Sequence, residues 1–325
     1  MIETIDQYRT IGIVGVSKNS GKTTTLNALI DRYKHESLGL TSIGLDGESL
    51  DQVNFLPKPK IKVYPNMVVA TAQSCLDDTT IDYRILCDTP YHTPLGKIRL
   101  ALCNSEGFIM LAGPSTNEEM NMVLKLLKLY VHRIFVDGAL SRQTFSAIHE
   151  LEGIILATGA AFSPVMAETV YKTKHMIDIF QYPKTTYKIP TNYVLVMQCK
   201  NQMVMRQNKS HEAMKQVFML HKDEIDWLYI RGAITDRLID LIVDYRIKNI
   251  TLIIDDPTKL LFHHRYHMMF EKLNIRVEVI KNVPLLLITI NPFSPIGQPY
   301  EIELFKTEIQ KLSTIPVINV KDLEV

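Results

Sequence analysis

Residues 9–25 combine, in the required order, the residue types that bind a polyphosphate. The segment has the spacing G-x-x-x-x-G-K-[ST], with Gly15 and Gly21 followed directly by Lys22 and Thr23. Glycines let successive backbone N–H groups point at one anion, and the start of a helix adds its positive dipole end. The lysine then reaches the β- and γ-phosphates, and the threonine hydroxyl ligates Mg²⁺. The segment therefore predicts a site for a nucleoside triphosphate and Mg²⁺.

The residues on either side of this loop predict the elements that hold it. Positions 11–14 are mostly apolar and indicate a buried strand, and positions 26–33 carry apolar side chains at helical spacing. A strand before the motif and a helix after it are the context in which such a motif binds phosphate. The nucleotide is expected to contact Gly15, Ser17, Lys18, Asn19, Ser20, Gly21, Lys22, Thr23 and Thr24.

Acidic residues that end later strands are the expected partners of Mg²⁺, because ligands gather at the carboxyl ends of parallel strands. Asp88 ends the apolar strand Tyr83–Pro90, so we assign it to Mg²⁺, directly or through water. Asp46 ends an earlier strand and is expected to position the attacking nucleophile, with Glu48 as a further candidate. The alternative is that these acids only cap turns. The expected catalytic residues are Lys22, Asp46 and Asp88.

The chain lacks the motif by which GTP-binding proteins recognise guanine. A guanine-reading N-K-x-D motif would indicate GTP, but Asn208–His211 and Thr173–Met176 both lack its acid. The sequence therefore favours ATP over GTP, with Mg²⁺ as the accompanying ion.

Two further segments permit more than one interpretation. His263, His264 and His267 have the spacing H-H-x-x-H, which can chelate zinc, although the neighbouring Met and Phe residues favour a half-buried helix. The loop Asn291–Gly297 contains two prolines at the end of an apolar strand. It either reverses the chain or contacts a ligand or partner.

The alternation of strands and helices predicts an α/β fold with two domains in the 325 residues. Residues 1–183 are expected to form a P-loop NTPase domain with a mostly parallel sheet, in which Ser115 or Thr116 caps the helix that follows. Prolines and polar residues at 181–192 indicate a boundary. Residues 190–325 are expected to form a second, smaller Rossmann-like α/β domain that meets a partner.

Composition indicates the cellular compartment of the protein and the classes of partner it is expected to have. The chain has 36 basic and 35 acidic residues, so no global field attracts nucleic acid or a membrane surface. Its four cysteines lack C-x-x-C spacing, which indicates reduced thiols. The first residues lack a signal-peptide profile, and no apolar stretch approaches the length of a membrane-spanning helix. We therefore expect a cytoplasmic protein without nucleic-acid or membrane partners.

Three fragments together resemble one family: Gly15–Thr24, Thr93–Gly96 and Val136–Arg142. They are similar to the smaller, P-loop subunit of the reactivase of lysine 5,6-aminomutase, an adenosylcobalamin-dependent enzyme. The resemblance covers most of the chain, but only the phosphate loop is a specific motif. It implies an ATP-using chaperone that works with a MutS-like ATPase to exchange damaged cobalamin for intact cofactor on an aminomutase client. Asp88–Tyr91 lacks the glycine of a D-x-x-G switch, and a D-x-H-x-x-G cobalamin motif is absent.

Two other functions use the same loop. A small-molecule kinase or ligase of the dethiobiotin-synthetase kind would phosphorylate a substrate acid, and a nucleotide-sensing regulatory module would bind ATP without turnover. The sequence does not decide between a monomer and a homo-oligomer. The expected function is that of a slow ATPase within a reactivating chaperone.

Overall fold

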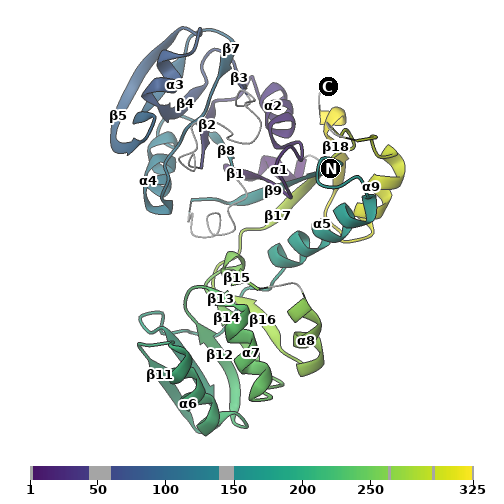
Figure 1. Cartoon of the computed structure of the whole chain (residues 1–325). Coiled ribbons are helices and arrows are strands. Elements are labelled where there is room, and N and C mark those ends of the chain that lie inside the picture. Colours follow the sequence, from purple (N-terminus) through teal and green to yellow (C-terminus); the bar gives the residue numbers. More distant parts are fainter. Residues whose placement is uncertain (1–2, 44–59, 139–149, 263–264, 295–296, 324–325) are drawn as a thin grey trace. The chain divides into compact units, whose positions relative to one another are not determined.

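The computed structural model describes residues 3–43, 60–138, 150–262, 265–294 and 297–323 (Figure 1). The chain forms two compact units, a larger one from Met1–Ile177 and Val283–Val325 and a smaller one from Asp178–Asn282. The chain therefore leaves the larger unit once and returns to it. The predicted boundary near residue 183 is close to the observed exit. The prediction that all of residues 190–325 form the second domain is wrong, because residues 283–325 belong to the larger unit.

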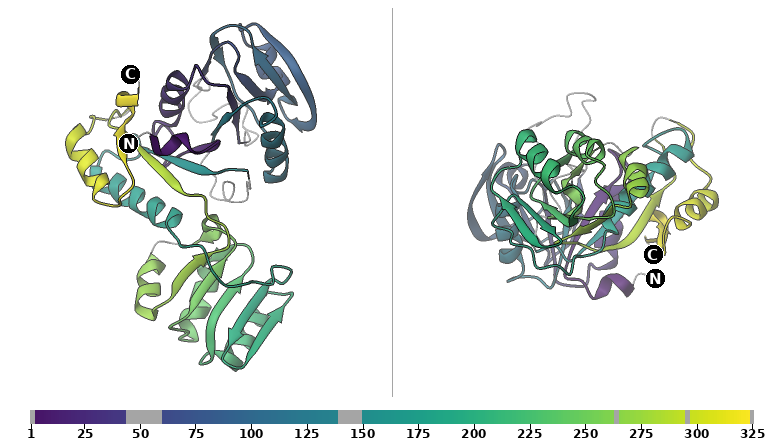
Figure 2. Two further views of the ribbon diagram at one scale, coloured as in Figure 1. Left: turned by 180° about the vertical axis from the view of Figure 1, so that it is seen from behind. Right: turned by 90° about the horizontal axis from the view of Figure 1, so that it is seen from below.

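The larger unit is built on a nine-stranded sheet with the order β18-β17-β9-β1-β8-β2-β4-β6-β5. Figure 2 shows the ribbon from behind and from below. The strands from β18 to β4 pair in parallel, and β6 pairs antiparallel with both β4 and β5. In chain order they are β1 (Thr10–Gly15), β2 (Leu38–Ser42), β4 (Val68–Ala72), β5 (Tyr83–Thr93), β6 (Gly96–Cys103), β8 (Arg133–Asp137), β9 (Gly153–Gly159), β17 (Leu285–Asn291) and β18 (Val317–Asn319). The predicted α/β fold with a mostly parallel sheet is thus confirmed.

Helices and a short ribbon complete this unit. The helices are α1 (Glu3–Asp6), α2 (Lys22–Arg32), α3 (Gln73–Asp77), α4 (Asn117–Leu127), α5 (Met166–Phe180), α9 (Ile302–Gln310) and the 3₁₀ turn η2 (Val320–Leu323). The ribbon pairs β3 (Ile61–Val63) with β7 (Gly107–Ile109) in antiparallel fashion. Thr116 caps α4 as predicted, because its hydroxyl accepts a hydrogen bond from the Glu119 amide at 3.2 Å.

Apolar periodicity explains why α2 lies against the centre of the sheet. Leu26, Leu29 and Ile30 are fully buried and share one core cluster with Ile11 and Ile13 of β1. The helical spacing of these side chains places them on one face, and every residue of β1 is buried. Packing of α2 therefore fixes the segment that connects it to β1.

The smaller unit has its own sheet, with the order β11-β10-β12-β14-β16. The strands β12 (Ile225–Ile230), β14 (Thr251–Ile254) and β16 (Arg276–Val279) are parallel, while β10 (Leu195–Cys199) and β11 (Gln202–Arg206) form an antiparallel hairpin beside β12. The other elements are α6 (His211–His221), α7 (Asp236–Asp244), α8 (Arg265–Leu273), the 3₁₀ turn η1 (Pro257–Lys259) and the paired strands β13 (Ile234–Thr235) and β15 (Leu260–Leu261).

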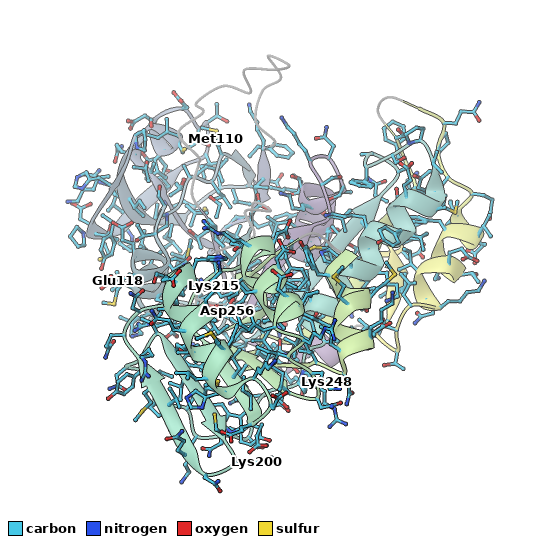
Figure 3. The ribbon with its side chains drawn as sticks, turned by 60° about the horizontal axis from the view of Figure 1, so that its bottom comes forward. Met110, Glu118, Lys200, Lys215, Lys248 and Asp256 are labelled. Atoms are coloured by element: carbon cyan, nitrogen blue, oxygen red, sulfur yellow. The ribbon has the colours of Figure 1, made fainter. Side chains whose placement is uncertain are left out.

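The two faces of this smaller sheet are covered differently. Met214 of α6, Ile239 of α7 and Phe270 of α8 belong to one core cluster, so these three helices cover the same face of the sheet. On the other face, Trp227 and Tyr229 form a separate cluster with residues of the 187–193 segment. The unit thus has its own core. Figure 3 shows its side chains, including buried Asp256 after β14.

The described helices include none that combines the length and apolar character needed to cross a bilayer. His263, His264 and the side chain of His267 lie outside the described residues, so the predicted H-H-x-x-H arrangement is not tested.

Candidate functional site

The glycine loop, residues 15–23, leaves the carboxyl end of β1 and enters α2. β1 is a central strand that pairs with β8 on one side and β9 on the other. The Val16 amide donates to the carbonyl oxygen of Ala157 at 2.9 Å, and the Thr25 amide donates to that of Gly21 at 2.8 Å. The predicted order of strand, loop and helix is therefore confirmed, with α2 beginning at Lys22.

Both glycines of the loop are required by its conformation. Gly21 has a φ of 98°, and a Cβ there would lie 2.8 Å from the Cβ of Asn291. A Cβ on Gly15 would lie 2.1 Å from the Ser20 hydroxyl oxygen and 2.7 Å from Cγ of Lys22. The loop therefore closes over its own start: a side chain at Gly15 would collide with Ser20 and Lys22, and one at Gly21 would collide with Asn291.

Lys22 and Asp137 form the charged centre of the site. Asp137 ends β8, beside Ile13 of β1, and the Lys22 ammonium donates to the carbonyl oxygen of Gly138 at 3.1 Å. Burial raises the pKa of Asp137, whereas the charge of Lys22 lowers it; burial lowers the pKa of Lys22, whereas Asp137 raises it. Burial thus disfavours the charged form of each group, and the opposite charge of its neighbour stabilises it.

Two buried polar atoms beside this pair lack partners among the described residues. They are Oδ1 of Asp137 and the hydroxyl oxygen of Ser20. Buried polar atoms are nearly always hydrogen-bonded in folded proteins, so each unpaired atom calls for an explanation. An ion or ligand bound at the loop would explain the unpaired Oδ1 of Asp137, because Asp137 and the loop lie at the same edge of the sheet.

The other predicted loop residues are also brought together here. Ser17 and Thr23 are half-buried, and Lys18, Asn19 and Thr24 are exposed. Asp46, Glu48 and residues 139–142 lie outside the described residues, so the roles predicted for the two acids are not tested.

Asp88 does not belong to this site. It lies on β5, and β8, β2, β4 and β6 separate that edge strand from β1, a distance of roughly 24 Å across the sheet. Its side chain is 47% exposed and pairs with Arg99 at 2.9 Å and Lys97 at 3.6 Å. The prediction that Asp88 holds Mg²⁺ beside the loop is wrong, because its strand joins an antiparallel hairpin instead of lying next to β1.

Asn291 borders the glycine loop on the opposite side from Asp137. It ends β17, its carbonyl oxygen accepts from the Ala160 amide at 3.0 Å, and its side chain lies against Gly21. A buried hydrogen bond of 2.7 Å between the hydroxyls of Thr25 and Thr289 also joins α2 to β17. The start of the Asn291–Gly297 loop is therefore next to the glycine loop, and residues 295–296 lie outside the described residues.

The sequence analysis did not assign Asp137 or Asn291 to the nucleotide site, although it named Asn291 as the start of a loop that could contact a ligand. Asp137 carried a visible signal, since it follows an apolar run in the sequence, as Asp88 does. Asn291 carried a weaker one, as the last residue of a strand placed in the wrong domain. In both cases the missing information was which strand lies beside β1.

Comparison with known proteins gives no further assignment: no protein-family model, no curated protein and no solved structure matches this chain. The chemistry must therefore be argued from the loop itself. Together with the end of β8, it offers backbone amides at a helix start, the ammonium groups of Lys18 and Lys22, the half-buried carboxylate of Asp137 and hydroxyls from Ser and Thr. This set can bind a polyphosphate together with a divalent cation.

Proposed function

We propose that the larger unit is a P-loop nucleotide-binding domain that binds ATP with Mg²⁺ and hydrolyses it slowly in the cytoplasm. The observation that carries the proposal is that Lys22, at the start of α2, donates to the carbonyl oxygen of Gly138, directly after half-buried Asp137 at the end of the adjacent strand β8. Phosphoryl transfer needs a cation that binds phosphate and an acid that binds Mg²⁺ within one site. The start of α2 supplies the cation, and the end of β8 supplies the acid.

The residues present fit a magnesium–triphosphate group. The loop closes so tightly around Gly15 that a Cβ there would collide with Ser20 and Lys22, and Asp137 has a buried oxygen without a partner among the described residues. The loop amides and the start of α2 would hold the phosphates, and Lys22 would exchange its bond to Gly138 for phosphate oxygens. The Thr23 hydroxyl and Asp137 would hold Mg²⁺, directly or through water. Bound Mg²⁺ would neutralise charge that develops on the phosphate oxygens.

Nucleotide selectivity tests this proposal on the unaltered protein. Because a ligand that binds only the folded state stabilises it, Mg²⁺·ATP is expected to raise the melting temperature more than Mg²⁺·GTP does. The measurement is thermal denaturation with each nucleotide, paired with phosphate release over hours. No shift with either nucleotide would contradict the proposal, and a shift with GTP alone would correct the choice of base.

We further propose that this ATPase serves as the smaller subunit of a reactivating chaperone for a cobalamin-dependent aminomutase, with a MutS-like ATPase as partner. The resemblance of three sequence fragments supports it. A second support is the smaller unit, which has a separate core and exposes Met219 by 65% and Leu220 by 69% on α6. Adjacent exposed apolar side chains suit a surface that docks on a protein.

The chaperone role predicts that ATP turnover responds to proteins. Basal phosphate release is expected to be low and to rise when the MutS-like partner and a cobalamin-inactivated aminomutase are added together, followed by recovery of aminomutase activity with adenosylcobalamin. Each component added alone is the control. Stimulation by a small carboxylic or amino acid instead would favour the kinase or ligase of the dethiobiotin-synthetase kind. Tight ATP binding without turnover in any mixture would favour the nucleotide sensor.

A further inference from the structure

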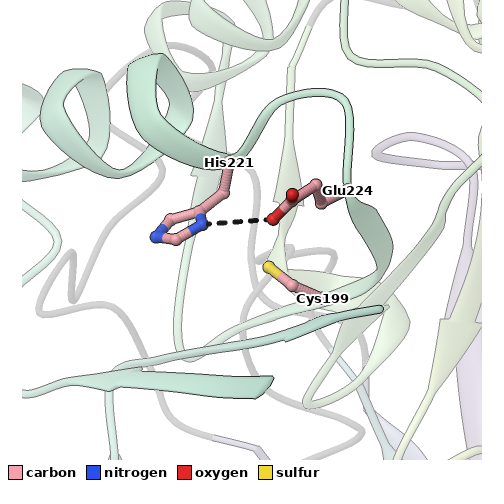
Figure 4. A group of neighbouring side chains, drawn as sticks. All are labelled: Cys199, His221 and Glu224. Carbon is pink, nitrogen blue, oxygen red and sulfur yellow. Dashed lines mark ion pairs between the residues drawn. The ribbon is translucent and has the colours of Figure 1, made fainter. Parts of the chain in front are cut away.

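Cys199, His221 and Glu224 come together in the smaller unit (Figure 4). Cys199 ends β10, His221 ends α6, and Glu224 lies in the turn between α6 and β12. One ligand atom from each residue lies within 4.8 Å of those of the other two, and Nδ1 of His221 is 3.8 Å from a carboxylate oxygen of Glu224. A thiol, an imidazole and a carboxylate therefore converge on one point.

Backbone hydrogen bonds hold the three side chains in place. The amide of Lys200, in the hairpin turn labelled in Figure 3, donates to the carbonyl oxygen of Glu224 at 3.1 Å. The Glu224 amide donates to the carbonyl oxygen of His221 at 2.9 Å. The pairing of β10 with β12 also shifts between Gln198 and Cys199, which re-aims the end of β10. The convergence thus follows from the fold of two joined segments.

The imidazole of His221 has an unsatisfied nitrogen. Its Nδ1 atom is buried and has no hydrogen-bond partner among the described residues, because 3.8 Å to Glu224 is too long for a hydrogen bond. A simple ion pair between His221 and Glu224 would leave that nitrogen unbonded and would not involve the thiol. A shared ligand at the centre of the three groups would satisfy all of them.

A reactive thiol is a poor explanation for the same three residues. Cys199 is fully buried, whereas a nucleophilic cysteine must be reached by its substrate. Burial raises the pKa of its thiol, and the carboxylates of Glu224 and Asp226 raise the pKa further. Both effects oppose formation of a free thiolate, while a bound cation would favour it.

We propose that Cys199, His221 and Glu224 bind a divalent transition-metal ion, with zinc as the best match, and leave one coordination position open. Sulfur, nitrogen and oxygen donors together are the ligand set of zinc, whereas Mg²⁺ and Ca²⁺ prefer oxygen alone. Ligand atoms around a tetrahedral zinc lie about 3.5 Å apart, given its bond lengths. The observed 3.8 Å is close to that value, and the side chain of Glu224, 51% exposed, can turn inward to close the remaining gaps.

Cobalt provides the direct test, because Co²⁺ replaces Zn²⁺ and reports its ligands by absorption. The full-length protein is titrated with Co²⁺. We expect a thiolate-to-cobalt charge-transfer band that saturates at one equivalent and disappears when Zn²⁺ is added. Absence of such a band would overturn the proposal. The result does not depend on the glycine loop, so it can fail or succeed independently of nucleotide binding.

Variants assign the ligands. Cys199→Ser is expected to abolish the band, and Glu224→Gln, an exposed change that leaves the core intact, to weaken Co²⁺ binding by about 100-fold or more, since even outer-shell partners cost 10–100-fold. Matched controls are Cys103→Ser, at a buried thiol in the larger unit, and Glu212→Gln, on the exposed face of α6. Melting without metal verifies folding. Unchanged binding in Glu224→Gln, or loss of binding only when His263, His264 and His267 are replaced, would overturn the assignment.

Discussion

Asp137→Ala is expected to reduce Mg²⁺-dependent ATP hydrolysis by about 100-fold or more, the effect of removing one preorganised electrostatic group from an active site. Asp137 is the described acid at the end of β8, next to β1, and the positive charge of Lys22 lowers its pKa. ATP is expected to bind Asp137→Ala in EDTA, but added Mg²⁺ should no longer increase affinity or turnover. The measurement is the initial rate of phosphate release at saturating ATP over a range of Mg²⁺ concentrations.

Asp88→Ala is the matched control for this variant. It removes an acid that ends an apolar run in the sequence, as Asp137 does, but lies on the far edge strand of the same sheet. Its exposed ion pairs with Lys97 and Arg99 contribute about 0–1 kcal/mol to stability, so the protein should stay folded and active. Loss of Mg²⁺ dependence in Asp88→Ala but not in Asp137→Ala would contradict the site. If both variants kept it, the acid that holds Mg²⁺ would have to be sought at Asp46 or Glu48.

The part of the site that could be predicted from sequence is the part formed by local interactions. The glycine loop depends on the left-handed backbone of Gly21, on the absence of a Cβ at Gly15 beside Ser20 and Lys22, and on the apolar period of α2. Each of these involves residues that are close together in the sequence. The cap at Thr116 is local in the same way. These elements formed where the sequence indicated.

Strand order could not be predicted, and it decides the rest of the site. Asp88 and Asp137 both end apolar runs, but only pairing between distant segments determines that β8 lies beside β1 and β5 at the edge. The same limit applies to β17, which joins the larger sheet after the chain has passed through the smaller unit. Hydrophobic patterning identifies a buried strand but not its neighbour.

The cluster in the smaller unit is a further case. Neither α6 nor β11 is predicted from the sequence, and these two elements lie between Cys199, the last residue of β10, and His221, the last residue of α6. That spacing matches no compact metal-binding motif, so the three side chains become a candidate only when the fold brings them together.

Lys22→Ala is expected to weaken the binding of Mg²⁺·ATP by about 10–150-fold, since charge-assisted hydrogen bonds contribute about 1.5–3 kcal/mol. Its ammonium is the positive group that the described glycine loop places beside Asp137. The fold should persist, because the hydrogen bond that this side chain makes among the described residues goes to a loop carbonyl, that of Gly138. Lys125→Ala, an exposed lysine on α4, is the matched control.

Isothermal titration of Mg²⁺·ATP into the unaltered protein, Lys22→Ala and Lys125→Ala measures this loss directly, with melting temperatures recorded without nucleotide. The account predicts saturable binding by the unaltered protein and by Lys125→Ala, and strongly weakened binding by a folded Lys22→Ala variant. Equal affinity of all three proteins, or no binding by the unaltered protein, would contradict the assignment of the glycine loop as a nucleotide site.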